Sequence, residues 1–96
     1  MPQFFINAHD YTDTDALNRR LANRDAHLQR ISEYKAKGNI VIGGAKLNQE
    51  NKMIGSMLVV DFPDMESTQE WISNDPYIKG KVWGNIEVTV FKAANV

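Results

Sequence analysis

Apolar and polar residues recur along this chain with two different periods, and the changes of period divide it into six predicted elements. A period of two residues, in which alternate side chains face opposite sides of a sheet, predicts strands over 3–8, 39–45, 54–62 and 85–92. A helical period predicts a long helix over 14–38 and a short one over 65–73. The resulting order is βαββαβ.

That order is typical of a ferredoxin-like α+β fold, with a four-stranded antiparallel sheet and two helices on one face. Two helices leave the other face uncovered, and several apolar residues would lie there. Depending on register, these are Phe5 or Phe4, Val41 or Ile42, Met57 or Leu58, and Phe91 or Val90. Monomers rarely expose so much apolar surface, so we expect a homodimer packed sheet to sheet with two-fold symmetry.

The predicted helix over 14–38 has a charged residue inside its apolar stripe. At about 100° per residue, the stripe consists of Leu17, Leu21, Leu28, Ile31 and Lys35. Arg24 falls in the middle of this stripe, and a buried guanidinium is costly unless an anionic group meets it. His27 lies three residues further on, at the edge of the same helical surface.

The ends of both helices carry recognisable signals. Thr12 and Asp15 have the spacing of a capping box, while Asp13 or Thr14 could serve as the N-cap instead. Gly38 stands where a glycine commonly ends a helix. Asp64 is expected to cap the helix over 65–73.

Length and composition set broad limits. The 96 residues are enough for one domain, spanning 1–96, and the net charge of −1 with dispersed basic residues argues against nucleic acid as a partner. The longest apolar run, 57–60, is too short to cross a bilayer. No signal-peptide pattern is visible and the chain has no cysteine, so we expect a cytoplasmic protein without disulfides or thiolate metal sites.

His27 is the first candidate for chemistry because its side chain titrates nearest neutrality and suits a general acid or base. Asp75 precedes Pro76, which favours an extended turn that could hold a carboxylate in one direction. An aspartate that accepts the imidazole N–H would fix the ring's tautomer. A half-exposed helix histidine without a role remains the alternative, and one sequence does not show whether Asp75 reaches His27.

Arg24 could bind a carboxylate or another anion, or its side chain could extend along the helix into water. Tyr77 and the Gly43-Gly44 pair could line a pocket or serve only as core and turn, and Arg19 and Arg20 are expected to be solvated. No metal-binding motif or phosphate loop is present, so no metal and no cofactor is expected. His9 and Asp10 are adjacent on a strand and would point to opposite faces, which prevents a direct dyad.

Several short motifs in this order resemble the YCII-related (YciI-like) family. They are Asp10 after the first strand, the Arg-Leu-x-x-Arg-x-x-His-Leu run over 20–28, Gly43-Gly44, and the Asn-Asp-Pro-Tyr turn over 74–77. The resemblance implies a ferredoxin-like fold, assembly as a dimeric α/β barrel, and an active site built on a His/Asp pair. That pair maps to His27 and Asp75, with Arg24 beside them.

Two functions are therefore expected from the sequence. The first is a small enzyme that transfers a proton on a small anionic organic molecule, in a lyase or isomerase reaction, with His27 and Asp75 as catalytic pair. Arg24, Tyr77 and Gly43-Gly44 would bind its substrate. The second is a non-catalytic binding or accessory dimer that uses the same pocket.

Overall fold

The structure is a computed structural model, and it describes residues 2–96. Within this range it contains four strands and three helices. In chain order they are β1 (Gln3–Asp10), α1 (Ala16–Ala36), β2 (Ile40–Leu47), β3 (Met53–Asp61), α2 (Met65–Ser73), α3 (Pro76–Lys79) and β4 (Trp83–Phe91). The predicted βαββαβ order is confirmed, with the four-residue α3 as an addition that the sequence pattern did not indicate.

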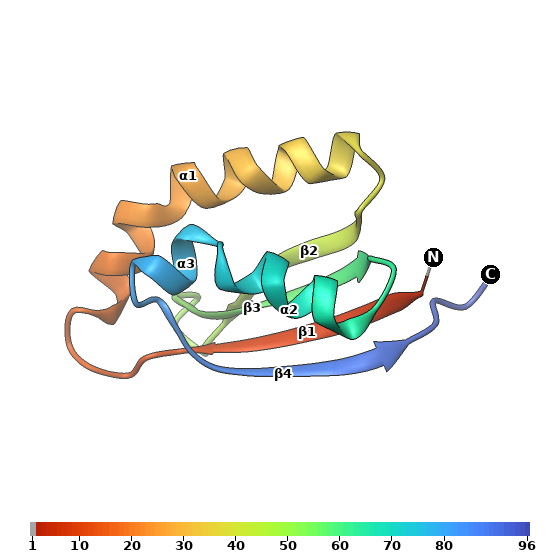
Figure 1. Cartoon of the computed structure of the whole chain (residues 1–96). Helices are drawn as coiled ribbons and strands as arrows, with labels where there is room; N and C mark the ends of the chain where they lie inside the picture. Colours follow the sequence, from red (N-terminus) through yellow and green to blue (C-terminus); the bar gives the residue numbers. More distant parts are fainter. Residues whose placement is uncertain (1) are drawn as a thin grey trace.

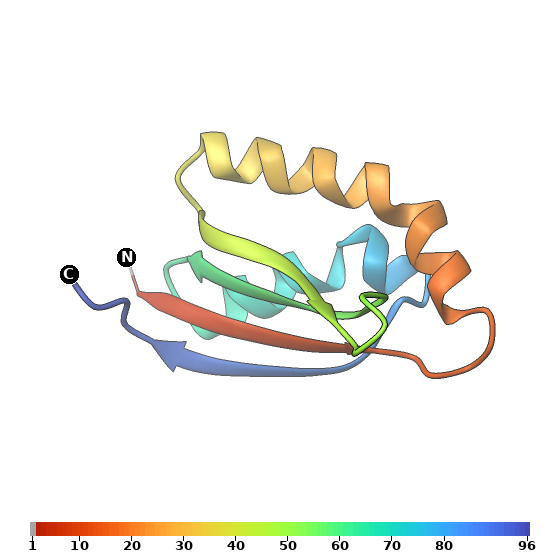
Figure 2. The same ribbon diagram turned by 180° about the vertical axis from the view of Figure 1, so that it is seen from behind.

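The strands form one antiparallel sheet in the order β2-β3-β1-β4. The helices lie on one side of the sheet and leave the opposite side open, as the two views in Figure 1 and Figure 2 show together. The ferredoxin-like α+β fold is therefore as predicted. The strand alternation is also as predicted, since Phe4, Ile6 and Ala8 all lie buried on the side that faces the helices.

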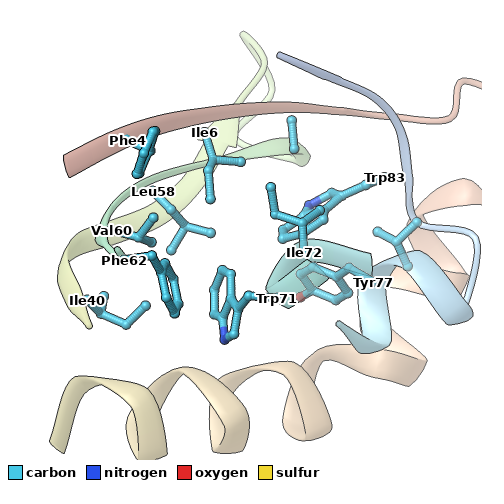
Figure 3. Packing of buried hydrophobic residues seen from close by; sticks show 12 residues of the cluster. Phe4, Ile6, Ile40, Leu58, Val60, Phe62, Trp71, Ile72, Tyr77 and Trp83 are labelled. Carbon is cyan, nitrogen blue, oxygen red and sulfur yellow. The ribbon is translucent and has the colours of Figure 1, made fainter. Parts of the chain in front are cut away.

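The hydrophobic core fills the space between the sheet and the helices. Figure 3 shows Phe4, Ile6, Leu58 and Val60 projecting from the strands toward Trp71 and other helical residues. Phe62 packs against Trp71 at 5.4 Å between ring centroids. An aromatic contact thus closes the core where β3 leads into α2.

Helix α1 is rotated relative to the prediction. Its buried residues are Ala16, Arg20 and His27, whereas Leu21 and Leu28 of the predicted stripe are 53% and 43% exposed. The buried side of α1 carries charged groups that find partners on the sheet and on α3. These ion pairs, rather than the leucines, lie on the side of the helix that faces the sheet.

The helix ends agree with the prediction in part. Gly38 has a φ of +86°, the left-handed conformation expected of a glycine that follows a helix. Asp64 caps α2 by accepting a hydrogen bond from the Ser67 N–H at 2.7 Å. The capping box of α1 does not form, because its N-cap residue Asp15 makes no side-chain cap bond. Instead, Asp13 accepts a bond from the Asp15 N–H at 3.3 Å.

The open face of the sheet has an apolar half and a polar half. The apolar half includes Phe5, Phe91 and Ile42, of which Ile42 is 57% exposed. Phe5 and Phe91 lie 6.1 Å apart between ring centroids. The polar half carries Lys46 and His9, joined by a 3.0 Å contact between Nζ and Nδ1.

Candidate functional site

The centre of the candidate site is a buried contact between His27 and Asp75. His27 projects from the inner side of α1, and Asp75 stands directly before α3. The imidazole Nδ1 and the carboxylate Oδ1 are 2.8 Å apart, and the two residues are 6% and 0% exposed. A carboxylate only accepts hydrogen bonds, so the network assigns the ring proton to Nδ1 and leaves Nε2 unprotonated in the neutral ring.

Asp75 is held in place by its local structure. Pro76 begins α3, and Asp75 caps that short helix by accepting the Tyr77 N–H on Oδ1 at 2.9 Å. Arg30 donates to the other oxygen, Oδ2, at 3.0 Å and also to the Trp71 carbonyl at 2.7 Å. The carboxylate therefore has a fixed direction, as the sequence predicted for the Asp-Pro turn.

A second buried ion pair lies beside the first. Arg20 donates through Nε to Asp10 Oδ2 at 2.7 Å and through Nη2 to Oδ1 at 3.3 Å, which is a two-point contact. Arg20 is 2% exposed, so its predicted solvation is wrong. Arg24 instead is exposed, which corrects its predicted burial. Arg20 lies seven residues before His27, almost two helical turns, and so shares its inward side of α1.

A small cavity of about 140 Å³ opens between α1 and the strands β2 and β3. Arg20, His27, Ser56 and Tyr77 form its polar wall, and Arg24, Gly43 and Gly44 also line it. The structure thus brings all six predicted site residues together, since Asp75 contacts His27 directly. Within residues 2–96, Arg24 makes no hydrogen bond or ion pair, so a cation is free at the pocket.

Tyr77 packs its ring against His27. The two rings stack at 3.9 Å between centroids and 12° between planes, and Trp83 meets both edge-on at 5.5 Å. Burial raises the pKa of the Tyr77 hydroxyl above its ordinary value of 10.0, and the Arg20 and Arg24 cations only partly offset that effect. Tyr77 therefore presents a neutral phenol to the cavity at neutral pH.

His9 lies on the other face of the sheet, away from the cavity. Its Nδ1 contacts Lys46 and its Nε2 is 3.2 Å from Glu87 Oε1. Asp10 points to the opposite face, where it binds Arg20, in agreement with the strand alternation predicted for this pair.

Sequence reasoning passed over three polar residues of the site. They are Arg20, Arg30 and Ser56, whose side chains reach Asp10, Asp75 and the cavity respectively. A helical wheel centred on His27 rather than on the leucines would have placed Arg20 and Arg30 on one face with it. Nothing in the sequence distinguishes Ser56 from an ordinary strand serine.

Two features are absent from residues 2–96. Residues 2–96 contain no group of three or more histidine, cysteine, aspartate or glutamate side chains placed to hold a metal ion. In the same range, none of the helices combines the length and the apolarity needed to traverse a bilayer.

Together, fold and site define a ferredoxin-like α+β protein with a buried His/Asp pair beside a small polar pocket. The chain belongs to the YCII-related domain family, whose model matches residues 4–92. This family and the structural likeness below place it in the dimeric α/β barrel superfamily.

Individual proteins are similar over nearly the whole chain. Protein YciI of Escherichia coli (strain CFT073) is 29% identical over 95 residues, covering 93% of this chain and 95% of that protein. An uncharacterized protein of Haemophilus influenzae is 28% identical with the same coverage. Among solved structures, the 5-chloro-2-hydroxyhydroquinone dehydrochlorinase TftG from Burkholderia phenoliruptrix AC1100, in complex with 2,5-dihydroxybenzoquinone, matches with a TM-score of 0.82. It is 26% identical and covers 96% of this chain and 95% of its own.

Proposed function

We propose that this protein acts in the cytoplasm as a small enzyme that transfers a proton on a small anionic organic molecule, in a lyase or isomerase reaction. His27 is the proton-transferring group, Asp75 orients it, and Arg24 binds the negative charge of the substrate. Tyr77 and the Gly43-Gly44 backbone form part of the pocket wall. The reaction needs no cofactor, because proton transfer is within the chemistry of an imidazole.

One observation carries this proposal: the bond from Nδ1 to Asp75 leaves His27 Nε2 as the ring atom available for chemistry. His27 lines the cavity, and in residues 2–96 Nε2 has no hydrogen-bond partner. The neutral ring with its proton on Nδ1 is the form that accepts a proton at Nε2. When it does so, the buried carboxylate of Asp75 stabilises the resulting imidazolium.

The size and charge of the pocket support a small anion. A cavity of about 140 Å³ is close to the roughly 150 Å³ that holds a benzene ring. The free guanidinium of Arg24 supplies the positive charge that a carboxylate or a phenolate requires. The similar protein TftG is a dehydrochlorinase whose bound ligand is also a single oxygenated ring, which supports a lyase reaction on such a molecule.

We also propose that the protein is a homodimer packed sheet to sheet. The apolar half of the open face supports this assembly, because Phe5, Phe91 and Ile42 would be removed from water by a second copy. The pocket lies on the other side of the sheet, so dimerisation leaves it accessible.

The experiment that tests the function begins with a thermal-shift screen of small carboxylates, phenols and hydroxyquinones, including 2,5-dihydroxybenzoquinone. Ligands that stabilise the protein are then assayed for turnover. We expect His27→Ala to lower kcat by about 10²-fold or more, the usual contribution of a general base or acid. Arg19→Ala, whose side chain contacts Asp13 and the Lys81 carbonyl and does not line the cavity, is the matched control and retains activity.

A variant His27→Ala that turns over within a few-fold of the wild type would contradict the catalytic role. The second candidate, a binding module, is favoured by the accessible Arg24, which could capture an anion without chemistry. It predicts ligands that bind and depend on Arg24 but are never converted.

A further inference from the structure

The hydrogen bonds at Ser56 leave its hydroxyl proton without an acceptor. Ser56 Oγ accepts from Arg20 Nη2 at 2.6 Å and from Trp83 Nε1 at 3.1 Å. Guanidinium and indole N–H groups are donors only, so both lone pairs of the oxygen are occupied. Ser56 is 3% exposed, and within residues 2–96 its O–H makes no hydrogen bond of its own. Ser56 lines the cavity, so a ligand bound there is the acceptor available to this proton.

Over residues 2–96, the Tyr77 hydroxyl proton also lacks an acceptor. Its oxygen accepts from Arg20 Nη1 at 3.4 Å, and in the described part of the chain its proton has no acceptor. The raised pKa of this phenol keeps the proton in place at neutral pH. The Arg20 guanidinium thus donates to both hydroxyl oxygens. Both hydroxyl protons remain for an acceptor oxygen on a ligand.

Arg20 is fixed while it does this. Asp10 neutralises its charge through the two-point contact, and the guanidinium lies 4.7 Å over the Tyr77 ring centroid. The charge of Arg20 is therefore already balanced by protein. Ser56 and Tyr77 therefore contribute two neutral O–H donors to the same cavity that His27 lines.

We propose that the hydroxyls of Ser56 and Tyr77 form an oxyanion site for a carbonyl or phenol oxygen of the substrate. This inference rests on the proposed function and names its substrate class, an enolisable carbonyl compound or a hydroxylated quinoid ring. Donors aimed at the atom where negative charge develops favour the transition state over the bound substrate.

The electron flow for an enolisable carbonyl follows from these positions. His27 Nε2 takes a proton from the carbon next to the carbonyl, and the C–H electron pair forms the C=C bond of an enolate. The carbonyl π pair moves to oxygen, where Ser56 and Tyr77 donate their hydrogen bonds. When the carbonyl re-forms, the C=C electron pair makes a new C=C bond to the next carbon and expels a leaving group there with its electron pair. In a substrate with a further C=C bond the enolate is a dienolate, and His27 instead returns the proton to its γ carbon. The first outcome is elimination and the second is isomerisation.

Arg24 and the two hydroxyls differ in charge and in exposure. Arg24 lines the pocket as an exposed, unpaired cation, whereas the Ser56 hydroxyl is buried. Arg24 thus suits a permanent charge on the substrate, such as a carboxylate, and the hydroxyl pair suits charge that appears during reaction. A fully charged phosphate would demand cations where the site presents neutral donors.

The test is the affinity of 2,5-dihydroxybenzoquinone, measured by titration of its absorbance with wild type, Ser56→Ala and Tyr77→Phe. Each substitution removes one donor, and Tyr77→Phe keeps the ring that stacks on His27. We expect each to weaken binding by about 10-fold, the effect of one lost hydrogen bond to a charged oxygen. Ser73→Ala, on the exposed side of α2, is the matched control and leaves the affinity unchanged.

Thermal unfolding confirms that each variant is folded, and because Tyr77→Phe is nearly isosteric it keeps the test valid if Ser56→Ala is unstable. Affinities that stay within about 2-fold in both variants would overturn the oxyanion site without touching the role of His27. Failure of the wild type to bind the probe at about 1 mM, or equal binding of inorganic phosphate, would overturn the substrate class. Loss of proton transfer is tested separately by His27→Ala, so the two proposals fail independently.

Discussion

Single residues set the character of this pocket because several of them are charged groups that have been withdrawn from water in pairs. The Arg20–Asp10 contact has side chains only 2% and 5% exposed, and His27–Asp75 is equally enclosed. Such pairs contribute little net stability when intact but are costly to break, because the remaining charge stays buried. Here these contacts fix positions: Asp10 holds the Arg20 guanidinium, and Asp75 holds the His27 ring.

Asp10→Asn isolates the effect of one of these charges. The substitution leaves Arg20 buried without its counter-charge, and we expect the free energy of unfolding to fall by about 3–5 kcal/mol. Urea denaturation followed by circular dichroism measures the change. Asp13→Asn removes the same charge from the exposed Arg19 pair and is expected to alter stability far less. Equal losses in both variants would show that Arg20 is not held by this contact.

At the scale of elements, the strands and α2 were predictable and the rotation of α1 was not. Strand alternation and the Asp64 cap are local signals, so β1 and α2 (Met65–Ser73) were located closely. The side of α1 that turns inward depends on Asp10 and Asp75, which lie on other elements. Helix α3 has only four residues, too few to display a period. The His27–Asp75 pair was indicated by family resemblance rather than by spacing, which carries no information on contacts 48 residues apart.

Two glycines of neighbouring strands give opposite predictions. A Cβ at Gly55 would lie 2.4 Å from the Ala8 carbonyl oxygen of the adjacent strand, whereas a Cβ at Gly44 has nothing within 4 Å. We expect Gly55→Ala to destabilise the protein by about 1–3 kcal/mol, because β1 and β3 must move apart. Gly44→Ala is the control and should be neutral or slightly stabilising. Thermal unfolding of the two variants measures the difference. A Gly55→Ala variant as stable as the wild type would contradict the β1–β3 packing.

The start of α1 carries a pH-dependent contact. Hydrogen bonds from Arg19 to Asp13, at 2.7 and 2.8 Å, lower the pKa of Asp13 from 3.8 to about 2. Because the folded-state pKa is the lower one, this stabilisation is complete above pH 3.8 and is lost as the pH falls toward 2. The difference in Tm between wild type and Asp13→Asn should therefore be constant near neutrality and shrink to nothing in strong acid. A difference that is undiminished at pH 2 would be inconsistent with the contact.

At the scale of the whole molecule, the sheet separates two surfaces of different character. The cavity lies on the helical side, and the apolar half of the open face lies on the other. This separation lets a second copy cover Phe5, Phe91 and Ile42 without blocking the pocket.

Sedimentation velocity tests the proposed assembly. We expect a dimer at about 10 μM and a monomer for Phe5→Glu, because a buried unpaired charge opposes sheet-to-sheet packing. Leu21 is 53% exposed on α1, so Leu21→Glu is the matched control and should remain dimeric. A monomeric wild type, or dissociation caused by Leu21→Glu alone, would contradict this interface.

The measurement that bears most directly on the central claim is the side-chain ¹⁵N NMR spectrum of His27 at neutral pH, in wild type and in Asp75→Asn. If the buried carboxylate orients the imidazole for proton transfer, Nδ1 carries the proton and Nε2 has the shift of an unprotonated nitrogen. Asp75→Asn should disturb that state, because the amide no longer requires a donor. A wild-type ring with its proton on Nε2, or one that is indifferent to Asp75→Asn, would contradict the proposed catalyst.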